Sequence, residues 1–356
     1  MRKTILVSVP LLMLLILSSL LVNAAEPVLQ PLPKPLAANA VASLKLSKQG
    51  WIFSFMGLGA GKTWKDITKD AWQMSLDTGK WEEIRPVPGP AGRLDAAAIG
   101  VREQVFLFSG YVVDGRGAEN PVPDVNIYEP LLHRWYRGAD IPVAVGGAVI
   151  GSYRDRYIYL VGGRSKEGPV KNVQVYDVEK DSWRQATAIA GEAVFGAGGA
   201  LLDDTIFYVN GAYRNPSDDS SYVASDECWA GKIDHHDPTK VQWTKLANHP
   251  GNARYGIAAG SSPKDQKIYF SGGSDDPYNY NGLGYNGKPV GPSPMTFAWN
   301  LRASKWEVMQ ENTANATLDN RALVVIPAAL VTIGGIAGNQ EVTARVNVIS
   351  KQNSAR

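Results

Sequence analysis

Charged side chains and one tyrosine occur just before short stretches of small residues, at points where they could meet a ligand. These residues are Arg93 and Asp95, Arg254 and Tyr255, and Asp319 and Arg321. A guanidinium pairs with a carboxylate through two parallel hydrogen bonds, and a carboxylate can move protons. The pattern indicates a site for an anionic ligand, with Asp95 as a candidate acid or base. The alternative is that the arginines are structural and bond loop carbonyls and carboxylates.

The stretch 274–294 offers a second set of polar and aromatic groups. Asp275, beside Asp276, is another candidate acid, and the pair could bind Ca²⁺ or sugar hydroxyls; the alternative is a solvated turn. Tyr278 and Tyr280 could stack on a sugar ring, or could simply pack the loop. Long loops in an otherwise tight repeat are often functional.

The elements that must position these groups repeat along the chain. Short β-type runs lead into pairs of small residues about 50–60 residues apart, at Gly57-Leu58-Gly59, Ser109-Gly110, Gly162-Gly163, Asn210-Gly211, Gly272-Gly273 and Gly334-Gly335. A tryptophan follows in each unit but the last, at Trp81, Trp135, Trp183, Trp243 and Trp306. Glycine lets neighbouring backbones approach closely, and large aromatic rings fill the wedges between units.

Repeats of this length with these landmarks are typical of kelch repeats, in which each unit forms one blade of a propeller. The sequence therefore predicts an all-β fold, a six-bladed kelch-type β-propeller with four antiparallel strands per blade, as a single domain over residues 25–356. We expect the binding face to carry the loops that follow the small pairs, over the central channel. These loops are 111–123, 164–170, 212–226, 274–294 and 337–340.

The last blade needs a strand from elsewhere, because the chain ends soon after Val346–Ile349 and an unpaired edge would remain. Residues 28–33 resemble the stretch that follows a blade's tryptophan. We expect an N-terminal strand here to close the last blade, with the first blade beginning at Ala40–Leu46. The alternative is a Pro-rich linker.

Residues 1–24 have the pattern of a secretory signal peptide, with a basic start at Arg2 and Lys3, a long apolar run and small residues before a cut between Ala24 and Ala25. The alternative is an uncleaved membrane anchor. The expected location is the periplasm or the exterior, with no membrane span after cleavage. The whole chain carries a net charge of +2, and loss of Arg2 and Lys3 leaves it neutral, which argues against nucleic acid as a partner.

No metal or cofactor is expected. The four histidines, His133, His235, His236 and His249, are dispersed, whereas a zinc site needs clustered ligands. The single Cys228 has no evident base for a nucleophilic role.

The signal peptide, the six units, the Gly57-Leu58-Gly59 variant of the first small pair and the N-terminal closing segment together resemble the bacterial N-acetylneuraminate epimerase family, the sialic-acid mutarotases. The resemblance implies interconversion of sugar ring forms by a carboxylate, with an arginine holding the sugar acid. It also implies an acid after the fourth small pair, where this chain has Ala212, with Arg214 at a different spacing. Galactose oxidase shares kelch repeats, but the paired histidines and Cys–Tyr arrangement of its copper site are missing here.

Two functions remain open from the sequence. One is a mutarotase or epimerase of a sugar acid such as sialic acid, using Arg93, Arg214, Arg254 and Arg321 and another acid such as Asp95 or Asp275. The other is a non-catalytic propeller that binds a glycan or a protein through its long loops.

Overall fold

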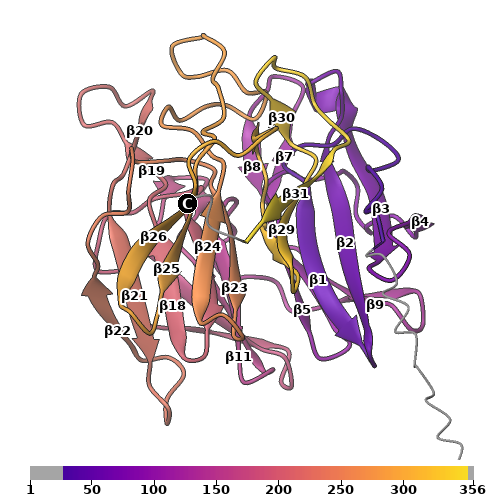
Figure 1. Ribbon diagram of the computed structural model, residues 1–356, viewed down its shortest axis with the longest axis horizontal. Helices are drawn as coiled ribbons and strands as arrows, with labels where there is room; N and C mark the ends of the chain where they lie inside the picture. The colour runs from indigo at the N-terminus through magenta and orange to yellow at the C-terminus, as the bar shows by residue number, and fades with distance from the viewer. Residues whose placement is uncertain (1–26, 352–356) are drawn as a thin grey trace, which may run out of the picture.

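The computed structural model describes residues 27–351, which form six antiparallel sheets arranged as blades around a central channel (Figure 1). Five sheets have four strands and the sixth has three. The predicted all-β, six-bladed propeller is therefore confirmed. The expected signal peptide lies outside the described residues. Within residues 27–351, no helix has the length and apolar character needed to cross a membrane.

The blades follow one another in chain order, and the innermost strand of each blade lines the channel. Blade 1 contains β1 (Ala40–Leu46), β2 (Gln49–Leu58), β3 (Ile67–Ser75) and β4 (Trp81–Ile84). Blade 2 contains β5 (Ala97–Val101), β6 (Gln104–Phe108), β9 (Val125–Glu129) and β10 (Arg134–Arg137). Blade 3 contains β11 (Val149–Tyr153), β12 (Tyr157–Val161), β15 (Val173–Asp177) and β16 (Ser182–Gln185).

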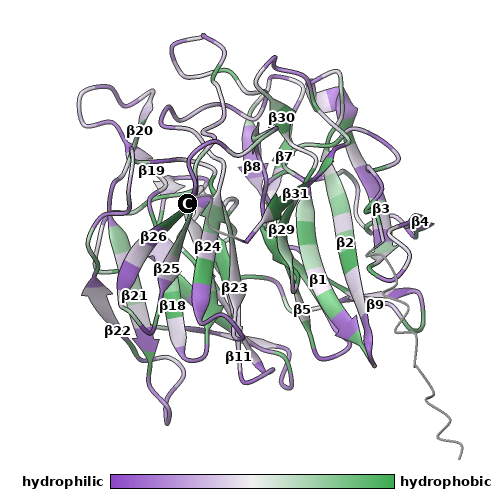
Figure 2. Cartoon of the chain, in the orientation of Figure 1, coloured by the Kyte–Doolittle hydropathy of each residue, from purple (hydrophilic) through white to green (hydrophobic). Residues whose placement is uncertain are grey.

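The second half of the chain repeats this plan. Blade 4 contains β17 (Gly198–Leu202), β18 (Thr205–Val209), β21 (Cys228–Ile233) and β22 (Val241–Lys245). Blade 5 contains β23 (Ala258–Ser262), β24 (Lys267–Ser271), β25 (Thr296–Asn300) and β26 (Lys305–Gln310). Blade 6 contains β28 (Val324–Val325), β29 (Ala329–Ile333) and β31 (Val346–Ser350). Apolar residues concentrate within the strands and hydrophilic ones at their ends and in the loops (Figure 2).

Short ribbons extend several blades on one face, which we call the loop face; it is uppermost in Figure 1. The ribbons pair β7 (Tyr111–Val113) with β8 (Glu119–Pro121), β13 (Arg164–Ser165) with β14 (Gly168–Pro169), β19 (Ala212–Arg214) with β20 (Tyr222–Ala224), and β27 (Thr317–Leu318) with β30 (Ile336–Ala337). In blade 1 the corresponding loop contains a single 3₁₀ turn, η1 (Trp64–Asp66). Four of the five loops predicted to form the binding face thus carry regular structure.

The landmark tryptophans join neighbouring blades, as their spacing predicted. The ring of Trp135 in blade 2 packs on Phe55 of blade 1, with centroids 5.5 Å apart, and its Nε1 donates to the carbonyl oxygen of Arg85 at 2.9 Å. Trp183 of blade 3 repeats both contacts with Phe108 and Ala139 of blade 2. Aromatic pairs of this kind stabilise by about 0.5–1.5 kcal/mol beyond their buried area.

The N-terminal segment joins blade 6 to blade 1 in the same way. Trp81 Nε1 donates to the carbonyl oxygen of Gln30 at 2.9 Å, so Gln30 occupies the place that Arg85 has after the outer strand of blade 1. The N–H of Leu32 donates to the carbonyl of Ala344 in blade 6 at 2.7 Å. Residues 27–36 thus complete the circle as predicted, but within the described residues they contain no β-strand, so blade 6 keeps three strands.

A ring of backbone hydrogen bonds narrows the channel mouth on the loop face. Its members occupy equivalent positions before the inner strands and all have left-handed φ, from 51° at Ala38 to 68° at Gly256: Ala38, Asp95, Gly147, Gly196, Gly256 and Asp319. Five N–H groups donate to the carbonyl of the equivalent residue in the adjacent blade at 2.8–3.3 Å. The N–H of Asp319 donates instead to the hydroxyl of Tyr278 at 3.2 Å. We call this the mouth ring.

Candidate functional site

A cavity of about 660 Å³ lies on the loop face, between loops of blades 2, 3, 4 and 5. Its lining residues come from the loops that the sequence predicted to form the binding face: Gly117, Ala118, Glu119, Arg164, Tyr222, Asn279, Tyr280, Asn281, Leu283, Gly284, Tyr285 and Gly287. Of these residues, Glu119 and Arg164 are the ones that carry charge. The volume falls within the range of small-molecule sites.

Arg164 is held in this cavity by aromatic rings from both neighbouring blades. Its guanidinium carbon lies 4.7 Å from the ring centroid of Tyr111 in blade 2 and 5.3 Å from that of Phe195 in blade 4. A guanidinium over aromatic faces gains cation–π attraction. The Nε atom of Arg164 is buried and has no hydrogen-bond partner among the described residues. The side chain is thus fixed in position with donor capacity left over.

Glu119, on β8, forms an ion pair with the guanidinium of Arg164, and each side chain is about four-fifths buried. The carboxylate therefore already occupies part of the arginine's binding capacity. An acidic ligand that reaches Arg164 must share the guanidinium with Glu119 or displace it.

Tyrosines and asparagines complete the cavity wall. The rings of Tyr222 and Tyr285 lie 5.1 Å apart and tilted, and Tyr222 in turn packs edge-on against Phe195 at 4.9 Å. Asn279 and Asn281 bring amide groups from the long loop of blade 5. Flat rings and amides beside an ion-paired arginine suit a polar ring with hydroxyl groups.

Beneath the mouth ring, two carboxylates share one arginine. Arg321 approaches Asp95 through Nε at 2.9 Å and Asp319 through Nη2 at 2.8 Å. Burial raises the pKa of Asp95, against the attraction of Arg321. Burial, opposed by Arg321 and reinforced by Asp95, raises the pKa of Asp319 to about 6. Asp95 and Arg321 border a small cavity of about 30 Å³ here and do not line the loop-face cavity. The positive charge of Arg164 nevertheless also acts on Asp95.

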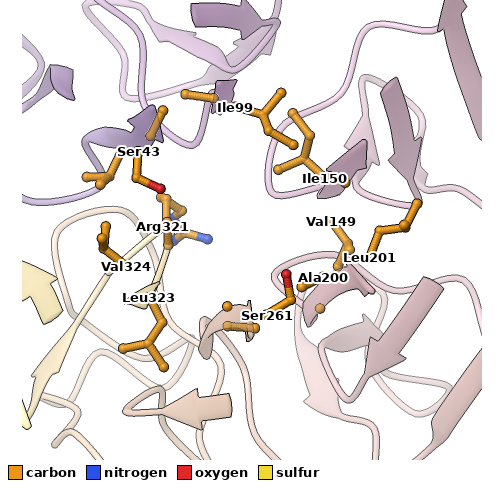
Figure 3. A pocket seen from close by; sticks show the side chains of 18 of the residues that line it. Ser43, Ile99, Val149, Ile150, Ala200, Leu201, Ser261, Arg321, Leu323 and Val324 are labelled. Atoms are coloured by element: carbon orange, nitrogen blue, oxygen red, sulfur yellow. The ribbon is translucent and has the colours of Figure 1, made fainter. Parts of the chain in front are cut away.

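The channel itself is lined mainly by small and aliphatic side chains of the inner strands and has a volume of about 220 Å³. Figure 3 shows Arg321 reaching toward the open centre among residues such as Ile99, Ile150 and Leu323. Arg321 was predicted to bind an anionic ligand; the structure places it near the axis with two aspartates already beside it.

Arg93 and Arg254 do not line the loop-face cavity, and here the structure favours the structural alternative. Both are 3% exposed. Arg93 donates to the carbonyl of Ser109 and to Asn126 Oδ1, within its own blade. Arg254 donates to the carbonyls of Gly272 and Met295. Burial lowers the pKa of each to about 10.

Of the remaining expected site residues, one lines the loop-face cavity and four do not. Tyr280 lines the cavity. Tyr255 and Tyr278 are buried, with ring centroids 5.0 Å apart, so neither presents a face to a ligand. Asp275 is exposed and accepts a hydrogen bond from Asn252, and Arg214 donates to the carbonyl oxygens of Glu167 and Asp219. Neither Asp275 nor Arg214 lines the cavity.

Ala212, which replaces the acid implied by the family resemblance, is fully buried and pairs with Phe195. Arg164 occupies the equivalent position in blade 3, where it pairs with Gly146. Sequence reasoning did not single out Arg164, Glu119, Tyr222 or Tyr285. A signal was available, since the other blades have Leu58, Tyr111, Ala212, Ser274 and Ile336 where blade 3 has Arg164.

In the described part of the chain, no three His, Cys, Asp or Glu side chains lie close enough together to hold a metal ion. His249 is buried, stacks on Phe297 and lies 2.5 Å from Asn210 Oδ1 through Nε2. Burial lowers its pKa to about 4. Cys228 is buried and burial raises the pKa of its thiol to about 12, which is the opposite of an activated nucleophile.

Comparison with known proteins supports the fold. Residues 153–188, which span most of blade 3, match the model of the Kelch motif. The chain is similar to a solved structure titled "Structure of YjhT", with 16% sequence identity and a TM-score of 0.69 over 89% of this chain and 95% of that one. No curated protein matches the sequence. The chain is thus a six-bladed propeller that carries a Kelch motif.

Proposed function

We propose that this propeller binds a sugar acid in the loop-face cavity and interconverts its ring forms. The observation that carries the proposal is Arg164, a cation fixed between aromatic rings, with an unpartnered buried Nε, in a cavity of tyrosines and asparagines. A guanidinium binds a carboxylate through two hydrogen bonds, the tyrosine rings can cover the sugar, and the amides can bond its hydroxyls.

Glu119 is the proposed acid–base group, in place of the acid that Ala212 replaces. While it pairs with Arg164, its carboxylate is stabilised and is a weak base. When the ligand's carboxylate takes the guanidinium, Glu119 loses this partner and gains a negative neighbour, and both changes favour its taking up a proton. Glu119 then accepts the proton of the anomeric hydroxyl, the bond between the anomeric carbon and the ring oxygen breaks, and the proton passes to the ring oxygen. Reclosure on the other face gives the second anomer.

Exchange between anomers, followed by NMR on N-acetylneuraminic and galacturonic acids, tests the proposal. We expect the protein to accelerate exchange and Arg164→Met to weaken binding about 10- to 100-fold, the loss of a charged hydrogen bond. Arg164→Lys keeps the positive charge but lacks the planar guanidinium, so its affinity for the sugar acid should fall between those of the native protein and Arg164→Met. Glu119→Gln should retain or tighten binding, because no carboxylate then competes for Arg164, but should abolish acceleration. Unchanged binding by Arg164→Met would refute this site.

The second candidate is a non-catalytic propeller that binds a glycan. It is favoured by the fact that Glu119, the one carboxylate among the cavity's lining residues, is already ion-paired. In that case both the native protein and Glu119→Gln bind the sugar acid and neither accelerates exchange. Protein binding through the long loops is a further proposal. It would be favoured if the protein bound neither of the two sugar acids.

The proposed place of action is the periplasm or the cell exterior. The apolar run of residues 1–24 supports it. N-terminal sequencing of the purified mature protein would test cleavage after Ala24.

A further inference from the structure

Trp64 is held in solvent by a well-ordered turn. Its side chain belongs to η1 of blade 1 and the residue is 42% exposed. The turn is fixed by Asp66, whose Oδ2 accepts from the N–H of Thr63 at 3.0 Å and from its Oγ1 at 2.5 Å. The N–H of Gly59 donates to the carbonyl of Asp66 at 2.9 Å. The turn therefore holds a large apolar ring at the surface in a defined position.

Trp64 borders a groove of about 510 Å³ between blades 1 and 2, which we call the Trp64 groove. Pro86, Pro90 and Val113 supply apolar walls. Its ionisable lining residues are Lys65, Lys69 and Asp70. Asp70 is paired with Lys34 at 2.9 Å, and Lys69 donates to the carbonyl oxygen of Gly89. Lys65 Nζ lies 5.6 Å from the centroid of the Trp64 ring. The groove therefore combines an aromatic face with a net positive charge.

The Trp64 groove and the loop-face cavity lie on either side of the same β7–β8 ribbon. Val112 and Val113, on β7, line the groove, whereas Glu119, on β8, lines the cavity. The turn of the ribbon passes the indole, since a Cβ at Gly115 would lie 3.6 Å from Trp64 Cζ2. The two sites are thus separated by one two-stranded ribbon, whose strands are about 5 Å apart.

We infer that the Trp64 groove is a second subsite for an acidic glycan chain whose reducing-end sugar, the one with a free anomeric hydroxyl, occupies the loop-face cavity. This inference rests on the proposed function and specifies its ligand as a chain of sugar acids. Trp64 stacks on the face of an inner sugar, and the lysines attract its carboxylate. A second acidic sugar matches the groove's positive charge, as the first matches Arg164.

Titration calorimetry with N-acetylneuraminic acid and galacturonic acid, each as monomer and linear trimer, tests the inference. The trimer of the preferred sugar should bind native protein about three- to tenfold more tightly than the monomer, the gain expected from one stacked aromatic contact. Trp64→Ala should remove this gain and leave monomer affinity unchanged. Tyr136→Ala is a matched control, since Tyr136 is equally exposed at 42% but lies outside the groove.

Equal affinity for monomer and trimer, or a trimer affinity that survives Trp64→Ala, would overturn the inference while leaving the proposed function intact. If the native protein bound neither monomer nor trimer of either sugar acid, or if Arg164→Met bound them as tightly as native protein does, the proposed function would be refuted instead. Loss of monomer affinity in Trp64→Ala would also count against a separate subsite. Circular dichroism of Trp64→Ala confirms that the fold is retained, as expected for an exposed side chain.

Discussion

Replacement of Arg321 by methionine should leave two buried carboxylates facing each other at the channel axis. Arg321 is 9% exposed in its side chain and lies between Asp95, 11% exposed, and Asp319, 2% exposed. Methionine keeps much of the aliphatic length without the charge. The substitution therefore tests the ion pairs rather than the packing.

The expected cost is large because removal of one partner leaves buried charge without compensation. Such losses amount to about 3–5 kcal/mol of unfolding free energy. The two carboxylates respond by taking up a proton, since burial already raises both pKa values and loss of the cation raises them further. The folded variant then binds more protons than its unfolded chain, where an aspartate has a pKa near 3.9. Relative to native protein, its stability must therefore rise as the pH falls from 8 to 5.

Urea unfolding followed by tryptophan fluorescence at pH 8 and pH 5 measures both effects. We expect the deficit of Arg321→Met relative to native protein to be largest at pH 8 and clearly smaller at pH 5. The triple variant with Asp95→Asn and Asp319→Asn removes all three charges and should recover most of the loss. Asparagine is suitable because it tolerates the left-handed backbone of both positions.

Two results would refute this reasoning. A deficit below about 0.5 kcal/mol at pH 8 would mean that the cluster is not a set of buried, mutually dependent charges. An equal deficit at both pH values, unrelieved in the triple variant, would assign the loss to packing.

Three further predictions concern stability. The unfolding free energy of native protein should fall by up to about 3 kcal/mol between pH 6.5 and pH 4, because the folded pKa of His249, about 4, lies below its usual 6.5. His249→Gln should lose less unfolding free energy over this range. Urea unfolding at a series of acidic pH values measures both. Leu36 lies in the closing segment and is 1% exposed, so Leu36→Ala should lower the free energy of unfolding in urea by about 2–5 kcal/mol. A negligible change would mean that the segment does not close the propeller. Gly196→Ala should lower the melting temperature far more than Gly287→Ala, because both have left-handed φ but only the first places a Cβ 2.3 Å from the Tyr255 ring; similar losses would show that backbone strain alone matters.

The mouth ring leaves a periodic trace in the sequence in addition to the small pairs and the tryptophans. Each ring position needs a left-handed residue, and glycine occupies three of them, Gly147, Gly196 and Gly256. A tyrosine fills the space beside two of them, Tyr255 at Gly196 and Tyr278 at Gly256. These requirements act within one blade and its neighbour, so they recur with every unit and leave a periodic trace.

The closing segment was also predictable, though its conformation was not. Gln30 and Leu32 repeat the backbone contacts made elsewhere after an outer strand. The three prolines at 31, 33 and 35 cannot donate backbone hydrogen bonds to a strand. The segment consequently occupies the predicted place without β structure.

The sequence by itself determined the number of blades, their order and the loops that build the binding face, because these follow from local patterns repeated along the chain. Only the tertiary structure decided which charged groups face the cavity. Arg93 and Arg164 both belong to segments that the repeat pattern assigns to the loop face. Arg93 nevertheless turns into its own blade, whereas Arg164 enters the cavity beside Glu119. The partners of Arg164, a residue of blade 3, come from blades 2 and 4, and no local pattern records which side chains such distant segments bring together.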